Sequence, residues 1–290
     1  MYRKSRQEIV DLFREQCEKG KILEGVGTGM EMTARHSDHI STDFLAFYHT
    51  GHLQRAGRSM LAGMLSYDDA NTIVQEMGAE ITASVSKIPV LAGVCGTDPF
   101  RKMDMFLNKL KELGFNGVQN FPTVGIVDGR FRINMEGTNI GYQLEVDMIR
   151  AAHELDLFTC PFVFDAEQAE AMTMAGADML LLHFGLVTKK ASERGEVPSL
   201  DSCCDKLRQV LEKSKAVRRN IMIGCCGQQV NSLEGAAQMV KKIPEAAGFF
   251  HFFPGKGEET EKGLSAKLKE YRALGKIKRA LLQKAGQINE

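Results

Sequence analysis

Two histidines and three carboxylates stand at or just after the ends of apolar runs, where side chains could do chemistry. His49 and His183 each end such a run, and an imidazole can give or take a proton near neutral pH. Asp98, Glu145 and Asp165 follow other runs, and their carboxylates could hold Mg²⁺ together with a substrate oxygen. Structural roles are the alternative, because a histidine can be a hydrogen-bonded core residue and the two aspartates can cap helices. No local spacing among the carboxylates marks a metal site.

Small and polar residues after other runs could bind an anionic substrate. Gly27, Thr28 and Gly29 follow the first run, and backbone N–H groups beside glycines can approach an anion, although such glycines can also simply shape a turn. Asn120 offers an amide to a carboxylate or an enolate, with a loop hydrogen bond as the alternative. Arg58 can pair with a carboxylate or a phosphonate, and a surface ion pair is its alternative.

No nucleotide cofactor is expected. A dinucleotide-binding sheet needs an acidic residue at the end of its second strand, where this chain has Tyr48 and His49. The PGKG segment at 254–257 follows the last apolar run, where barrels often bind a phosphate. It lacks the spacing of a P-loop, and a flexible turn with a solvated lysine explains it equally well.

The seven cysteines indicate a reduced, cytoplasmic protein. Their number is odd, two adjacent pairs occur at 203–204 and 225–226, and no CxxC spacing is present. This pattern excludes an exported disulfide framework and a zinc ribbon. Cys226 could be a nucleophile if a histidine lowers its pKa, whereas a buried, inert thiol is the alternative.

Composition restricts the classes of partner. The chain has 290 residues, with 37 basic residues balancing 37 acidic ones, so binding to nucleic acid or to an anionic membrane through bulk charge is not expected. A hydrophobic content of 43% is ordinary for a folded protein. No apolar stretch approaches the ~20 residues of a membrane helix, and the N-terminus lacks the apolar region of a signal peptide.

The order of the elements must bring these side chains together. Eight short apolar runs alternate with amphipathic helical stretches, after a leading helix at 5–19; the runs begin at residues 22, 44, 89, 117, 158, 177, 220 and 248. Continuous apolar runs are typical of parallel strands that are covered on both faces. The count predicts a (β/α)₈ TIM barrel, an α/β fold, as a single domain over residues 1–290. An open doubly wound sheet is the alternative.

Two connections are longer than a tight barrel requires. One follows the second strand, at 50–67, and the other follows the fourth strand, at 122–140. Within the second, the sequence GIVDGRFR predicts a small β-hairpin that turns at Asp128 and Gly129. Both leave the C-terminal end of the barrel, where barrel enzymes place their active sites, so they are candidate lids.

Several motifs taken together resemble the phosphoenolpyruvate hydrolase-like family of TIM-barrel proteins, whose members are often described as phosphonopyruvate hydrolases. The resemblance covers residues 22–186 and is carried by VGTG from residue 26, GHLQRAGRSMLAGMLSYDDAN from 51, PVLAGVCGTDPFR from 89, GVQNFPTVGIVDGRFR from 117 and GYQLEVDMI from 141. It implies a barrel related to phosphoenolpyruvate mutase and isocitrate lyase, enzymes that act on small 2-oxo acids with Mg²⁺ holding the enolate.

The resemblance also places residues at the presumed pocket: Gly27, Thr28, Gly29, Gly51, Arg58, Cys95, Gly96, Asp98, Asn120, Pro122, Thr123, Glu145 and His183. Three loops depart from the family pattern. His52 and Gln54 stand where more arginine is usual, CCGQQ replaces a pattern like CHGGP so that Cys226 stands where a histidine is expected, and HFFPGKGEETEKG replaces a Ser-rich turn.

Two functions follow from these observations. The first is a hydrolase or lyase that breaks a C–C or C–P bond in a small 2-oxo acid such as phosphonopyruvate, phosphoenolpyruvate or oxaloacetate. Asp98 and Glu145 would hold Mg²⁺, Asn120 and the 27–29 amides would stabilise the enolate, and His183 or His49 would transfer the proton.

The second function is that of a barrel that has lost catalysis and binds a small anion or a protein partner. The altered loops and the phenylalanine pairs at 249–250 and 252–253, which the sequence suggests are exposed, motivate it. A cysteine hydrolase that uses Cys226 is a third alternative.

A homo-oligomer is expected as well. The resemblance implies it, since the related barrels associate through their final helices. The last helical stretch of this chain, at 261–285, is long, amphipathic and rich in lysine.

Overall fold

The parallel sheet of the chain curls into a barrel. In the computed structural model, which describes residues 2, 4–185, 193–195, 197–252 and 257–288, every strand pair is parallel. The strands are β1 Leu23–Thr28, β2 Phe44–Phe47, β3 Val90–Val94, β4 Gly117–Asn120, β5 Phe158–Thr159, β6 Phe162–Val163, β7 Met179–His183, β8 Met222–Cys226 and β9 Gly248–Phe252. The predicted TIM-barrel class is confirmed.

The barrel closes through a broken fifth strand. The strands are ordered β5-β4-β3-β2-β1-β9-β8-β7-β6, so the two ends of the sheet are β5 and β6. These two are halves of one predicted strand, interrupted at Cys160 and Pro161. Proline has no N–H for the strand ladder, and this explains the interruption.

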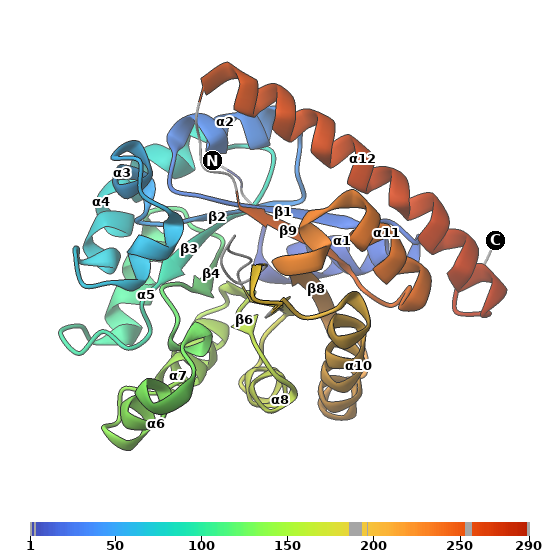
Figure 1. Cartoon of the computed structure of the whole chain (residues 1–290). Coiled ribbons are helices and arrows are strands. Elements are labelled where there is room, and N and C mark those ends of the chain that lie inside the picture. The colour runs from blue at the N-terminus through green and yellow to red at the C-terminus, as the bar shows by residue number, and fades with distance from the viewer. Residues whose placement is uncertain (1, 3, 186–192, 196, 253–256, 289–290) are drawn as a thin grey trace.

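Helices surround the strands (Figure 1). They are α1 Arg6–Glu18, α2 Glu31–His39, α3 Gly51–Arg55, α4 Ala70–Ser84, α5 Met103–Glu112, α6 Gly129–Gly137, α7 Gln143–Glu154, α8 Ala166–Met174, α10 Leu200–Val217, α11 Leu233–Lys242 and α12 Gly257–Lys284, with 3₁₀ turns η1 Met60–Met64, η2 Val124–Ile126 and η3 Gln228–Asn231. The leading and final helices are therefore confirmed. Ser5 caps α1 in a reciprocal pair with Glu8, and Asp165 caps α8, one of the alternatives weighed for that residue.

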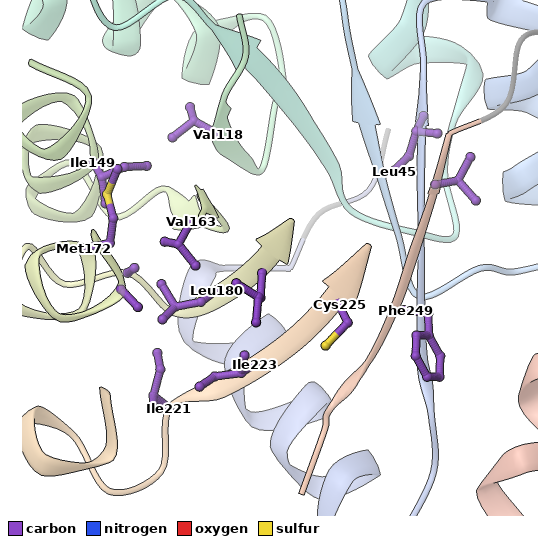
Figure 2. Close-up of a cluster of buried hydrophobic side chains, with 14 of the residues drawn as sticks. Leu45, Val118, Ile149, Val163, Met172, Leu180, Ile221, Ile223, Cys225 and Phe249 are labelled. Carbon is purple, nitrogen blue, oxygen red and sulfur yellow. The ribbon is translucent and has the colours of Figure 1, made fainter. Parts of the chain in front are cut away.

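Alternation along the strands divides the buried side chains into two layers. One layer lies between the sheet and the helices; Leu180, Ile223, Cys225 and Phe249 belong to it (Figure 2). The other fills the barrel interior, with its members Leu23, Phe44, Tyr48, Leu91, Phe158, Phe162, Met179, Leu181, Met222, Cys226 and Phe250. Successive residues of a strand point to opposite faces. Whether a residue at the end of a strand faces the barrel axis is therefore decided by its odd or even position along that strand, which we call its parity.

The leading helix closes the N-terminal end of the barrel. Ile9, Val10 and Phe13 of α1 are buried and belong to the interior layer. The ring of Phe13 lies 5.9 Å from that of Phe44 and 5.5 Å from that of Phe158, near the starts of their strands. The opposite, C-terminal end is left for the loops that carry the candidate site residues.

Two sequence expectations are wrong. The predicted hairpin around Asp128 and Gly129 is the turn η2 followed by helix α6, since Gly129 opens a helix in which residues 129–137 hydrogen-bond locally. Phe249 and Phe250 are buried, because β9 is covered on both faces. Phe253 lies outside the described residues. Within the described part of the chain, none of the helices is long and apolar enough to cross a membrane.

Candidate functional site at the barrel mouth

His183 is the predicted catalytic residue that faces the barrel mouth. It ends β7 with the same parity as Met179 and Leu181, which point to the interior. Its Nδ1 accepts a hydrogen bond from the backbone N–H of Gly185 at 2.9 Å, so Nε2 carries the proton. Burial lowers the pKa of His183 to about 4. At neutral pH the imidazole is therefore an uncharged hydrogen-bond donor.

A cavity of about 280 Å³ opens beside His183. Its walls are mostly apolar and come from the long connection after β2 and from the ends of β4, β6 and β9; they include Met60, Leu61, Met64, Phe121, Ile126, Phe162, Phe164 and Phe252. Its polar side chains include those of Gln54, Arg58 and Thr123. The volume is at the low end of the ~300–1,000 Å³ typical of small-ligand sites.

His49 holds the loop after β2 in place. His49 lies two residues after the end of β2, and its ring centroid is 5.9 Å from that of Phe121, which lines the cavity. The His49 side chain is buried, and its Nε2 lies 3.1 Å from the carbonyl oxygen of Gly63 in η1. Burial lowers the pKa of His49. This contact positions the loop that walls the cavity.

Asn120 and Glu145 form a buried hydrogen-bonded group behind β4. The carboxylate of Glu145 accepts from Asn120 Nδ2 at 2.5 Å, from Thr123 Oγ1 at 2.7 Å and from the Val124 N–H at 2.7 Å. Both residues are fully buried. Burial raises the pKa of Glu145 to about 7, and these hydrogen bonds limit the rise. The group fixes Thr123, which lines the barrel-mouth cavity.

Asp98 lies at a second cavity, of about 500 Å³, which also contains Thr123 and Cys95 in its lining. The carboxylate accepts from Asn71 Nδ2 at 2.8 Å and from the Phe100 N–H at 2.9 Å, and it pairs with Arg101. Asp98 does not cap a helix, because α5 begins only at Met103. The structure thus separates Asp98 from His183, although Thr123 lines both cavities.

The arrangement of Asp98 and Glu145 does not fit a Mg²⁺ ion. A guanidinium beside Asp98 repels a cation, and the carboxylate of Glu145 already accepts three protein hydrogen bonds. Among the residues that the structure describes, no group of three His, Cys, Asp or Glu side chains is placed to hold a metal ion. No catalytic step is therefore assigned to Mg²⁺.

The glycines that the sequence predicted to approach an anion lie where two loops pack closely together. A Cβ on Gly51 would lie 1.8 Å from the carbonyl oxygen of Gly29, and a Cβ on Gly29 would lie 2.3 Å from the Gly51 nitrogen. A Cβ on Gly27 would meet the ring of Tyr48 at 2.7 Å, inside the barrel. Thr28 Oγ1 accepts from the Met30 N–H at 3.0 Å. Gly29 and Gly51 thus allow the loop after β1 to pass directly against the start of α3.

The cysteines near the rim are poor nucleophiles. Cys226 is buried in the barrel interior, and its burial raises the pKa of the thiol. Cys95, in the turn after β3, has its pKa raised by desolvation too. Next to it, Gly96 packs on α7, where an added Cβ would lie 3.1 Å from the Glu145 Cα. Residues 254–256 of the PGKG segment, the possible phosphate site, lie outside the described residues.

Gln54 is a further residue of the site, which its type and spacing in the sequence do not single out. Gln54 was noted only as a departure from a family pattern, yet it is buried and lines the barrel-mouth cavity. Its position on the short helix α3, three residues after Gly51, is the one signal that could have selected it.

Comparisons with known proteins agree with this fold. Residues 8–274 match the family described as phosphoenolpyruvate hydrolase-like. The ToMV resistance protein Tm-1(GCR237) of Solanum lycopersicum is 38% identical over 269 residues, which are 93% of this chain and 36% of that protein. The ToMV susceptible protein tm-1(GCR26) of the same plant is 38% identical over 266 residues, 92% of this chain and 35% of that protein. The chain thus spans about a third of these relatives.

Solved structures support the same assignment of the fold. A phosphonopyruvate hydrolase in complex with oxalate and Mg²⁺ superposes with a TM-score of 0.54 at 12% identity, over 98% of this chain and 88% of that one. A 2,3-dimethylmalate lyase, described as a member of the PEP mutase/isocitrate lyase superfamily, gives 0.54 at 14% identity, over 90% and 86% of the two chains. The chain belongs to the phosphoenolpyruvate hydrolase-like family.

Proposed function

We propose that this protein is a hydrolase or lyase that breaks a C–C or C–P bond in a small 2-oxo acid at the barrel mouth. The observation that carries the proposal is His183, which presents an uncharged Nε2–H donor among aromatic rings. Phe162, Phe164 and Phe252 lie with ring centroids 5.7, 5.4 and 6.2 Å from the imidazole. A donor held in such an apolar site stabilises a developing oxyanion more strongly than water does.

The chemistry requires that negative charge be stabilised. When the bond beyond C3 of a 2-oxo acid breaks, its electron pair remains on the pyruvate fragment as an enolate, whose C3 then takes up a proton. In a hydrolysis, the hydroxyl of water is added to the departing group. We assign the enolate oxygen to His183 Nε2–H and the substrate carboxylate to Arg58, because both side chains line the cavity.

A pyruvate-release assay tests the proposal. The purified protein is incubated with phosphonopyruvate or oxaloacetate, with added Mg²⁺ or with EDTA, and pyruvate is measured. Phosphoenolpyruvate, whose hydrolysis to pyruvate breaks an O–P bond instead, serves as the comparison. We expect turnover that falls ~10²–10³-fold in His183→Ala, the usual cost of losing an oxyanion donor. Absence of turnover and of any thermal shift with these acids and their homologues would refute the proposal. The EDTA arm determines whether Mg²⁺ takes part.

The second candidate is a barrel that binds a small anion or a protein without converting it. It is favoured by the 38% identity to a Solanum lycopersicum protein described as a ToMV resistance protein, a description that names no reaction. It loses one of its sequence arguments, since Phe249 and Phe250 are buried. A thermal shift without turnover would support this candidate over the enzyme.

Two further expectations complete the proposal. We expect a reducing, cytoplasmic location, supported by the seven free cysteines. We also expect a homo-oligomer formed through α12. Light scattering measures the oligomeric mass, and a monomer at all concentrations would contradict it.

A further inference from the structure

The surroundings of the Gln54 side chain indicate that a ligand binds next to it. Gln54 is 3% exposed and lines the barrel-mouth cavity. Among the residues that the structure describes, neither its Nε2 nor its Oε1 has a hydrogen-bond partner. An amide that is buried without partners costs free energy, and buried polar groups are almost always satisfied by protein, water or ligand. A ligand that enters this cavity would supply the missing partner.

The walls of the same cavity are unsuited to a highly charged molecule. Met60, Met64, Ile126 and Phe164 contribute apolar surface next to Gln54 in the lining. Among the described residues of this lining, Arg58 is the one cation, since His183 is uncharged at neutral pH. One guanidinium can pair with one carboxylate, which would leave the phosphonate of phosphonopyruvate without a partner in an apolar site.

We infer that the cavity takes a 2-oxo acid with a single carboxylate and an apolar substituent on C3, and that Gln54 recognises its polar end. This inference rests on the proposed function. The Nε2 hydrogens of Gln54 would be donated to the oxo or carboxylate oxygens. Its Oε1 would accept a hydrogen from the water that a hydrolysis consumes.

Bond cleavage in such a substrate needs an electron-accepting carbon next to C3. An acyl group satisfies this requirement, giving a 2,4-dioxo acid, R–CO–CH₂–CO–COO⁻, with an apolar R. Water adds its hydroxyl to the C4 carbonyl, the C3–C4 electron pair goes to the enolate, and C3 takes up a proton. The products are R–COO⁻, pyruvate and one proton, and no oxidant or reductant is needed.

Binding measurements separate the apolar class from the charged class. Calorimetry compares phenylpyruvate and 4-methyl-2-oxopentanoate with pyruvate, oxalate and phosphonopyruvate. We expect the first two to bind at least 10-fold more tightly than pyruvate, because each buried methylene contributes about fourfold in affinity. Turnover is measured with 2,4-dioxopentanoate and its longer homologues, and we expect kcat/KM to rise with chain length.

A Gln54→Leu variant tests the residue, with Gln238→Leu, on the exposed face of α11, as its matched control. We expect Gln54→Leu to weaken phenylpyruvate binding at least 10-fold while its melting temperature stays equal or rises. A structural glutamine would behave oppositely, since its loss would lower the melting temperature. Gln238→Leu should leave the affinity unchanged.

The outcomes distinguish this inference from the proposed function. If phosphonopyruvate or oxalate binds more tightly than phenylpyruvate, the inference is overturned and the proposed function stands. If Gln54→Leu binds phenylpyruvate normally, the role of Gln54 is overturned. If none of these acids binds or is converted, the proposed function itself fails.

Discussion

The side chain of Asn120 pairs with the backbone of Phe162 across the break in the fifth strand. Asn120 Oδ1 accepts a hydrogen bond from the Phe162 N–H at 2.6 Å, and Asn120 Nδ2 donates one to the Phe162 carbonyl oxygen at 3.2 Å. The side chain thereby supplies hydrogen bonds that a continuous strand would make with its backbone. Because Asn120 also holds Glu145, the closure of the barrel and the position of Thr123 depend on the same residue.

Asn120→Ala should therefore destabilise the fold. It leaves the buried Phe162 N–H without its acceptor and removes one of the three hydrogen bonds that the Glu145 carboxylate accepts. We therefore expect a loss of about 2–4 kcal/mol in the free energy of unfolding. Urea denaturation measures it, with the exposed Asn108→Ala on α5 as the control. Equal stabilities of the two variants would contradict the bridging role of Asn120.

Glu145 should make stability fall as pH rises. Burial raises its pKa from the ordinary 4.5 to about 7. Between these two pH values Glu145 holds a proton in the folded protein but not in the unfolded chain. The contribution of this proton to the free energy of unfolding is therefore complete below pH 4.5 and is lost as pH rises through 7. The loss is about 3 kcal/mol at ~1.4 kcal/mol per unit.

Unfolding free energies at pH 5 and pH 8 test this dependence. Glu145→Gln should have a smaller difference between the two pH values than the parent protein. Glu154→Gln, an exposed glutamate on the same helix α7, should keep the parent difference. A parent protein that is equally stable at both pH values, with an unchanged Glu145→Gln variant, would refute the assignment.

His183 should remain uncharged across the physiological range. Its pKa is lowered to about 4, so its contribution to stability is present above pH 6.5 and is lost as pH falls through 4. Nitrogen NMR of labelled protein should show a protonated Nε2 and an unprotonated Nδ1 at pH 7, as the Gly185 hydrogen bond requires. A titration midpoint near 6.5 would show that the imidazole is exposed to solvent instead.

Gly51→Ala should be strongly destabilising. The new Cβ would meet the Gly29 carbonyl oxygen at 1.8 Å, and backbone on both sides leaves little room for relaxation. We expect a loss of about 2–3 kcal/mol, within the range for overpacking. Gly137→Ala in α6 is the matched control, because its Cβ would meet nothing within 4 Å. Thermal denaturation of both variants compares them, and similar melting temperatures would contradict the close approach of the two loops.

Arg58→Ala should impair binding without affecting the fold. Arg58 is exposed and lines the cavity, whereas Arg55, three residues earlier, is exposed and lies outside that lining. We expect KM for a 2-oxo acid to rise at least 10-fold in Arg58→Ala and to be unchanged in Arg55→Ala, since a charge-assisted hydrogen bond contributes about 1.5–3 kcal/mol. Arg58→Lys should recover only part of the loss, because lysine lacks the bidentate geometry. An unchanged KM in Arg58→Ala would remove the assigned carboxylate partner.

The sequence by itself determined the barrel and the side of it that carries the site. Continuous apolar runs alternating with amphipathic helices specify parallel strands, and parallel strands place all their C-terminal ends at one rim. It also determined that His183 faces inward, because alternate residues of a strand share a face and 183 alternates with 179 and 181 along β7. These features depend on neighbours that are close in sequence.

The tertiary structure alone decided what the remaining rim residues do. The hydrogen-bond partners of Asn120 and His49 come from other elements: Phe162 and Glu145 for Asn120, and Gly63 for His49. Asp98 meets Arg101 and Asn71 rather than His183. Gln54 becomes a candidate ligand contact only because the packed loops bury it beside a cavity, where no described residue is its hydrogen-bond partner. Burial and hydrogen-bond satisfaction are set by long-range packing, which no local spacing encodes.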